Sequence, residues 1–290
     1  MGREALAMRS VLLLLLMIPV PGAAATAPGL ADSAAVGRGP VAPSPRAEIK
    51  LSDDLVLREI GDGAFVVAHR FPGLCNSALV EMADGTLVLA GTPCTADATR
   101  ELLRWARARW GERRVVAINN GYHYDNLGGN EALLAAGVAV YGSDLTVRLL
   151  AERGEATRAL TLRLIGGETS RCYRALAEQR YHAPDHVFRA ADGLTLMFGG
   201  EQVRVIYPGP TQAPDKVLIY FPARKLLYGG CALIGGPRLG NMAEANVSSW
   251  LAAVRDLRAL AVEVAIPAHS PNLAPTVLAN TEALLAAASR

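Results

Sequence analysis

Short apolar runs, some alternating with polar residues and some continuous, predict β-strands along much of the chain. Two such runs, residues 78–80 and 87–89, flank Asp84-Gly85, a dipeptide that favours a two-residue hairpin turn. Glycine and proline clusters separate other runs in the same way. Further strands and hairpins are predicted at residues 55–57, 64–67, 115–118, 138–141, 194–207, 217–228 and 262–266.

Other segments place apolar residues every three or four positions, which is the helical period. Helices are predicted at residues 96–110, 128–136, 143–154, 246–260 and 275–288, with Thr95 and Ser143 as N-caps of the first and third. Residues 155–190 show no clean period and are expected to hold a helix and irregular chain. Helices alternate with strands, yet hairpins interrupt the alternation. The fold class is therefore α/β, as an αββα sandwich of two mixed β-sheets between helices.

Composition narrows the class of protein. The chain has 290 residues, 51% of them hydrophobic, so it is long enough and apolar enough to bury a sizeable core. Its formal net charge is only +2 and its aromatic content 6%, which argues against a nucleic-acid partner. These values leave a globular α/β or α+β protein. Separately from composition, we expect a small-molecule partner and a monomer.

The N-terminal residues carry the features of an export signal. Two arginines precede an apolar run at residues 10–20, and an Ala-rich exit follows, so residues 1–25 are interpreted as a signal peptide. The run is about half of the roughly 20 residues that a membrane-spanning helix needs, although an uncleaved anchor is the alternative. Residues 26–47 are expected to be a flexible leader before a single folded domain over residues 48–290. This predicts a periplasmic protein without stable membrane association.

Residues that can bind a metal follow three of the predicted strands. His123 and Asp125 come shortly after the strand at residues 115–118, Cys231 follows an apolar run, and His269 follows another. A His-x-Asp pair alone is common on protein surfaces. However, Asp125, Cys231 and His269 together offer an oxygen, a sulfur and a nitrogen, with one coordination position left for water. Three protein ligands and an open position are typical of catalytic zinc.

Several motifs, in their order and spacing, resemble those of one enzyme family. They are Gly91-Thr92-Pro93, Tyr122-His123-x-Asp125-x-x-Gly128-Gly129-Asn130, Tyr207-Pro208-Gly209-Pro210, Leu227-Tyr228-Gly229-Gly230-Cys231, Leu239-Gly240-Asn241 and Ala268-His269-Ser270. Over roughly residues 50–290 the chain resembles the metallo-β-lactamase superfamily, and within it the one-zinc subclass that hydrolyses carbapenems. The resemblance implies an αββα sandwich with one zinc ion per chain, held by Asp125, Cys231 and His269.

The chain departs from the family at several positions. Two-zinc relatives hold a second metal with three histidines, and the matching positions here are Gly121, His123 and Gln212. A stable second zinc is therefore not expected. The family also has a lysine that pairs with the substrate carboxylate, where this chain has Ile234. Arg238 is close enough in sequence to take that role, and its guanidinium would offer a bidentate fork.

The remaining candidate site residues have roles that follow from their chemistry. His123 is the candidate general base, because its ordinary pKa of about 6.5 suits proton transfer at neutral pH, and Asp125 could share the role. Asn241 matches the family's contact with the substrate carbonyl and could donate to an oxyanion. Gln212 can donate and accept hydrogen bonds with the substrate but cannot act as a base.

The hairpin at residues 75–91 also predicts a disulfide. If Asp84-Gly85 forms a two-residue turn, Cys75 and Cys94 face each other across the ladder, within reach of a disulfide in an oxidising compartment. The alternative is a pair of buried thiols. Cys172 is left over and is expected to be buried and inert.

Three functions compete at this stage. The leading one is zinc-dependent hydrolysis of β-lactam antibiotics, with carbapenems preferred. The second is hydrolysis of a lactone, ester or thioester on the same fold, because the lysine and two polar site positions are missing. The third is a degenerate member that binds metal with little activity.

Overall fold

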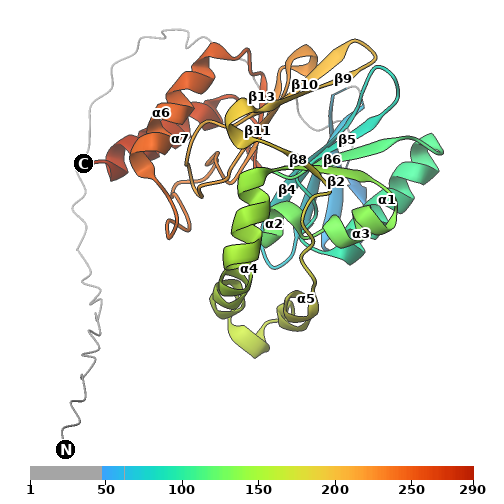
Figure 1. Ribbon diagram of the computed structural model, residues 1–290, viewed down its shortest axis with the longest axis horizontal. Helices are drawn as coiled ribbons and strands as arrows, with labels where there is room; N and C mark the ends of the chain where they lie inside the picture. The colour runs from blue at the N-terminus through green and yellow to red at the C-terminus, as the bar shows by residue number, and fades with distance from the viewer. Residues whose placement is uncertain (1–47, 62) are drawn as a thin grey trace, which may run out of the picture. The chain divides into compact units, whose positions relative to one another are not determined.

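Two β-sheets packed face to face form the centre of the structure, a computed structural model that describes residues 48–61 and 63–290 (Figure 1). Helices cover the outer face of each sheet, so the predicted αββα sandwich is confirmed. The predicted signal peptide at residues 1–25 and leader at 26–47 lie outside the described residues. None of the helices in the described part combines the length and the apolarity that a membrane crossing requires.

The first sheet has eight strands in chain order within the described residues. The first to fifth strands pair antiparallel with their neighbours, and the fifth to eighth pair in parallel, so the sheet is mixed. The strands are β1 Glu48–Lys50, β2 Leu55–Gly61, β3 Ala64–Arg70, β4 Leu74–Glu81, β5 Leu87–Ala90, β6 Val115–Ile118, β7 Ala139–Ser143 and β8 His186–Phe188.

The second sheet has five strands in the order β13-β12-β11-β10-β9. Two hairpins build most of it, as predicted, and β12 and β13 then pair in parallel. The strands are β9 Leu194–Phe198, β10 Glu201–Ile206, β11 Leu218–Phe221, β12 Leu226–Gly230 and β13 Val264–Pro267. Parallel pairing brings the carboxyl ends of β12 and β13 to the same edge of the sheet.

The described helices are α1 Ala96–Trp110, α2 Tyr124–Leu127, α3 Asn130–Ala135, α4 Asp144–Leu164, α5 Tyr173–Glu178, α6 Val247–Asp256 and α7 Thr276–Ala288, with 3-10 turns η1 Gly167–Thr169, η2 Ala190–Asp192, η3 Pro222–Arg224 and η4 Leu257–Ala259. Helices α1 and α3 pack on the first sheet, whereas α7 and η4 pack on the second. Helix α4 stands at the lower end of the sandwich in Figure 1, beside α2 and α5.

Alternation along the strands divides their side chains between two apolar layers. On β3, Val66 faces the layer between the sheets, together with Ile219 of β11 and Ile266 of β13. Its neighbours Phe65 and Val67 face the opposite way and contact the helices of the first sheet. Because successive side chains of a strand point to opposite faces, a stretch buried on both sides is apolar throughout, as residues 64–68 of β3 are.

The predicted turn of the β4–β5 hairpin is one residue too short. Met82 and Thr86 close the hairpin around three residues, Ala83 to Gly85, and Gly85 takes a positive φ of 79°. The longer loop shifts the ladder, so that Ala78 faces Ala90 rather than the next residue along the chain.

The predicted disulfide is corrected by this register. Cys75 faces His69 of β3, Cys94 lies beyond the end of β5, and both are free, buried thiols, as is Cys172. The thiols of Cys75 and Cys94 still interact. That hydrogen bond, together with burial, raises the pKa of Cys75 well above its ordinary value.

Helix α4 is longer than its sequence pattern predicts. Ser143 caps it as expected, by accepting a hydrogen bond from the Thr146 amide. The helix then continues through Gly154, the predicted end, to Leu164. A glycine inside a helix costs about 1 kcal/mol relative to alanine, which is too little to end a helix that packs on other elements. The helix therefore reaches across the edge where the strands end.

Asn76 of β4 ties the two sheets together at that edge. Its Nδ2 donates to the backbone carbonyls of Pro267 and Ser270, at 2.9 and 2.8 Å, and its amide donates to the Ala268 carbonyl at 2.7 Å. Its own carbonyl accepts from the Tyr228 hydroxyl at 3.1 Å. Asn76 is fully buried and thereby fixes the segment on both sides of His269.

Replacing Asn76 by alanine is expected to destabilise the protein by about 2 kcal/mol or more, because two buried carbonyls lose their donor. Chemical denaturation measures the change in the free energy of unfolding. Asn272→Ala is the control, because this asparagine in the following loop is exposed and makes one side-chain hydrogen bond, from the Ala274 amide at 3.0 Å; it should cost no more than about 1 kcal/mol. An equally small effect of Asn76→Ala would show that the two sheets are held together elsewhere.

Candidate metal centre and pocket

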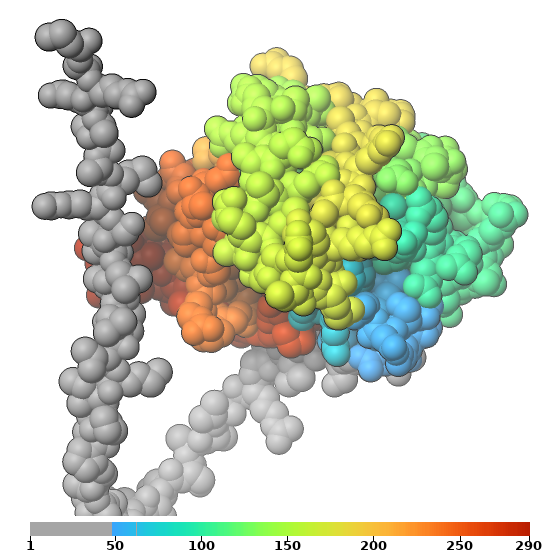
Figure 2. All heavy atoms as spheres, turned by 90° about the horizontal axis from the view of Figure 1, so that it is seen from below, coloured from blue at the N-terminus to red at the C-terminus, as the bar shows by residue number. Residues whose placement is uncertain are grey.

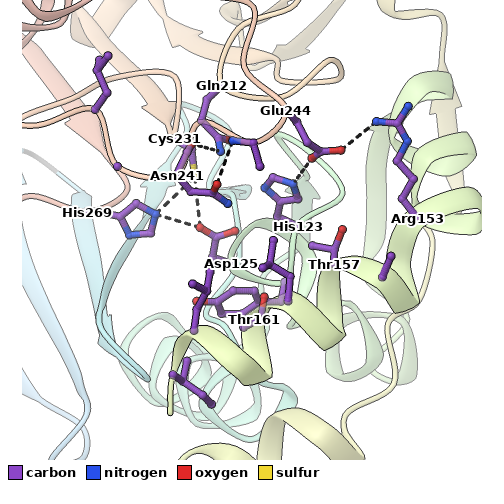
Figure 3. Close-up of a pocket in the computed structure, with 18 of the residues that line it drawn as sticks. His123, Asp125, Arg153, Thr157, Thr161, Gln212, Cys231, Asn241, Glu244 and His269 are labelled. Carbon is purple, nitrogen blue, oxygen red and sulfur yellow. Dashed lines mark hydrogen bonds and ion pairs between the residues drawn. The ribbon is translucent and has the colours of Figure 1, made fainter. Parts of the chain in front are cut away.

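The ends of three strands bring the predicted metal ligands together. Asp125 lies in the first turn of α2, shortly after β6, Cys231 directly follows β12, and His269 lies two residues after β13. Their ligand atoms all lie within 4.8 Å of one another. Figure 3 shows the three side chains pointing toward a common centre. The structure thus gathers an oxygen, a sulfur and a nitrogen from residues that lie 38 to more than a hundred positions apart in the chain.

The distances within this group suit a tetrahedral metal ion. Zinc–ligand bonds of roughly 2.0–2.3 Å at tetrahedral angles separate the ligand atoms by about 3.3–3.7 Å. Asp125 Oδ2 lies 3.1 Å from His269 Nε2, and Cys231 Sγ lies 3.2 Å from Asp125 Oδ2 and 3.6 Å from His269 Nε2. The residues therefore fit one such ion and leave a coordination position for water or substrate.

The tautomer of His269 is set by a second hydrogen bond. His269 Nδ1 lies 2.8 Å from the carbonyl of Leu74 in β4, and a carbonyl can only accept. Nδ1 therefore carries a proton, and Nε2 is the ring nitrogen that faces Asp125 and Cys231 and would bind a metal. This arrangement is usual for histidines that bind metals, because the outer hydrogen bond orients the ring.

Asp125 is an ionised carboxylate in a buried place. Burial opposes its ionisation, but the hydrogen bond from His269 and the charges of His269 and Lys216 outweigh burial and hold its pKa well below the usual range. Its side chain is only 7% exposed. Asn126 Nδ2 donates to Asp125 Oδ1, which orients the carboxylate so that Oδ2 faces the other two ligands.

A pocket of about 430 Å³ opens above the metal ligands. One wall is the face of α4 that carries Ala156, Leu160 and Leu164, and the opposite wall includes Ile234 and Leu239. In Figure 2 the green residues of α4 lie beside the orange part of the chain on this face of the molecule. The predicted irregular segment thus supplies a helix that covers the site with apolar side chains.

Glu244 is a site residue that the sequence analysis missed. Its Oε2 accepts from His123 Nε2 at 2.9 Å, and its Oε1 accepts from Arg153 of α4 at 2.9 Å (Figure 3). Its Oε2 also accepts from the Tyr122 hydroxyl at 2.6 Å. The bond from His123 is the largest of the effects that lower the pKa of Glu244, to about 2, against the opposing effect of burial. No motif signals Glu244, because its partners come from distant parts of the chain.

The predicted substrate-binding residues are only partly brought together. Gln212 and Asn241 line the pocket, and Gln212 Nε2 donates to the Asn241 carbonyl at 3.1 Å. Gln212 Oε1 is buried without a hydrogen-bond partner in the described structure, so it can accept from a ligand. Arg238, by contrast, is exposed and outside the pocket lining. Arg153 lines the pocket instead, paired with Glu244.

His123 lies in the pocket but does not join the metal ligands. Its Nε2 is bonded to Glu244, and its Nδ1 lies 3.4 Å from Lys216 Nζ. Both ring nitrogens are therefore engaged with other side chains. This arrangement suits a residue that orients its neighbours better than it suits the predicted general base.

Comparison with known proteins identifies the class to which this site belongs. A sequence model of the metallo-beta-lactamase superfamily matches residues 70–269, and the chain belongs to that superfamily. Its members similar to this chain are metal-dependent hydrolases that act on small molecules, and this chain is a hydrolase of the same kind. The resemblance stated from the motifs is thereby confirmed.

Individual relatives are distant. The chain is 24% identical to a metallo-beta-lactamase type 2 of Bacteroides fragilis, over 73% of this chain and 76% of that protein. It is 25% identical to one of Pseudomonas aeruginosa, over 68% and 70% of the two chains. A solved metallo-beta-lactamase from Pontibacter korlensis superposes with a TM-score of 0.64 at 27% identity, covering 80% of this chain and 99% of that one.

Removing the thiolate is expected to abolish tight metal binding. In Cys231→Ala, zinc affinity should fall by more than about 100-fold, because loss of even outer-shell partners costs roughly 10–100-fold. Metal content of the purified protein and competition with a chelator measure the change. Cys172→Ala, which removes a buried thiol outside the pocket, should keep the wild-type metal content. Equal zinc affinity in both variants would exclude Cys231 as a ligand.

Proposed function

We propose that this chain hydrolyses the cyclic amide of β-lactam antibiotics, with carbapenems preferred, and that it uses one zinc ion held by Asp125, Cys231 and His269. The convergence of these three side chains at the floor of a pocket is the observation that carries the proposal. The names of the curated relatives, which are metallo-beta-lactamases, support the choice of substrate.

The chain's own residues divide the work around the ion. When bound, zinc supplies a Lewis acid that polarises a carbonyl and lowers the pKa of water. Asn241 is placed to donate from its Nδ2, because its Oδ1 already accepts from the Ala243 amide at 3.1 Å. Gln212 Oε1 offers an acceptor to the substrate, and α4 lines the pocket with apolar side chains that can contact the substrate's apolar parts. Asp125 is the remaining candidate for the proton acceptor.

The alternative function is hydrolysis of a lactone, ester or thioester. The residues around the pocket favour it. Ile234 lines the pocket at the position where the family has its carboxylate-binding lysine. The arginine that lines the pocket, Arg153, is already paired with Glu244. A substrate with a carboxylate would have to compete with Glu244 for Arg153. A neutral, apolar substrate would not.

Export completes the proposal. The predicted signal peptide over residues 1–25 supports a periplasmic location, and the mature protein would then begin near residue 26. Small β-lactams act outside the cytoplasm, so a monomeric periplasmic hydrolase would meet them before their targets. N-terminal sequencing of protein from a periplasmic extract tests the cleavage.

A variant that keeps the metal tests the proposed catalysis. Asn241→Ala should lower kcat for a carbapenem by roughly 100–1,000-fold, as loss of an oxyanion donor does elsewhere, while the zinc content stays unchanged. Loss of the β-lactam absorbance follows the reaction, and Cys172→Ala is the control. Wild-type protein that holds zinc and cleaves lactones or thioesters, but no β-lactam, would establish the alternative function instead.

A further inference from the structure

A fully buried lysine lies directly behind the pocket. Lys216 has no exposed surface, and its ammonium is 3.4 Å from His123 Nδ1. The segment that carries it is fixed to the loop that carries His123, since the Val217 amide donates to the Asn120 carbonyl at 3.1 Å. Lysine is almost never fully buried unless a specific environment accepts its charge. Its place therefore calls for an explanation.

The loop beside His123 is shaped to admit this lysine. A Cβ added to Gly121 would lie 2.6 Å from Lys216 Nζ and 2.9 Å from its Cδ. Real Cβ atoms do not approach other atoms so closely, so any side chain at position 121 would displace the ammonium. Lys216 thus fills the volume that a side chain at position 121 would need.

The ammonium also determines the state of the His123 ring. An ammonium can only donate, so Nδ1 must accept from Lys216 and the ring proton must lie on Nε2. Nε2 then donates to Glu244, 2.9 Å away. Lys216 and Glu244 together hold His123 in one tautomer and one orientation, with neither nitrogen free to bind a metal.

The neighbouring residues reinforce this arrangement. Asp215, which precedes Lys216, accepts from the Tyr122 amide at 2.7 Å and from the Thr146 hydroxyl at 2.9 Å. These bonds fix the backbone beside His123 from the other side. The charge of Lys216 also reaches Asp125, where it is among the effects that favour the ionised carboxylate.

We propose that Lys216 is a positioning residue whose buried ammonium takes the place beside His123 that a second divalent ion would need, and so limits the centre to one metal. This role rests on the proposed one-zinc centre and names the residue that enforces it. A second ion at His123 would have to displace the hydrogen bond from Lys216. It would also face a fixed positive charge in a region shielded from water, where repulsion is strong.

The test compares binding of a second zinc equivalent in purified, zinc-loaded wild type and Lys216→Met. Methionine keeps much of the length of lysine, removes the charge and leaves Nδ1 free. Native mass spectrometry and calorimetry during a zinc titration should show one tight zinc in both proteins. The second zinc should bind more than about tenfold tighter in Lys216→Met. Lys225→Met removes a half-exposed lysine and should behave as wild type.

Second-zinc affinities that agree within about twofold between wild type and Lys216→Met, or two tight zinc ions in the wild type, would overturn the role of Lys216. These outcomes are separate from the fate of the proposed substrate, since the stoichiometry is measured without any β-lactam. A wild type that holds one zinc but cleaves no β-lactam would leave the role of Lys216 intact.

A second measurement, on the wild type and on Gly121→Ala, does not depend on whether Lys216→Met folds. Long-range ¹⁵N NMR of zinc-loaded wild type should show His123 protonated on Nε2 and not on Nδ1. Gly121→Ala keeps the charge but displaces the ammonium, so its spectrum should show a changed Nδ1 resonance. The opposite tautomer in the wild type would contradict the hydrogen bond from Lys216.

Discussion

The site depends on one constraint: the carboxylate of Asp125 is ionised although its side chain is almost fully buried. Asp125 lies in the first turn of α2 and has only 7% of its side chain exposed. An isolated buried anion would take up a proton, so positive charge or hydrogen-bond donors must surround it. His269 supplies both on one side, and the charge of Lys216 adds to them on the other. A metal ion at the open centre of the ligands would add to the same compensation.

The same constraint explains how the two sheets meet. His269 can face Asp125 only if β13 ends beside β4, and this placement is what the hydrogen bonds of Asn76 and the Leu74 carbonyl secure. Glu244 plays the matching part at the other wall, because it connects the loop after Cys231 to His123 and to Arg153 of α4. The floor of the pocket and its covering helix are thereby parts of one hydrogen-bonded network.

Local signals were enough to predict the two-sheet fold and the three clustered ligands, because strand ends, turns and chemically distinctive residues are visible in the sequence. The errors arise where tertiary packing, rather than the local sequence pattern, determines the structure. A third turn residue shifted the ladder at Cys75, and α4 passes Gly154 because its face packs over the pocket. Glu244 and Lys216 were missed for a related reason: each is an ordinary charged residue whose partners lie about a hundred residues away.

The residues at which this site departs from the family are best understood as one coupled change rather than as several independent losses of family residues. Gly121 leaves the volume that Lys216 fills, and Lys216 occupies the His123 nitrogen that faces it. Gln212 turns its amide to the Asn241 carbonyl and supports the loop that ends in Glu244. Restoring a histidine at position 121 alone would therefore bring it against Lys216 rather than create a metal site. On the proposed role of Lys216, the positive charge beside His123 is part of the protein itself, so positions 121 and 216 would have to be exchanged together.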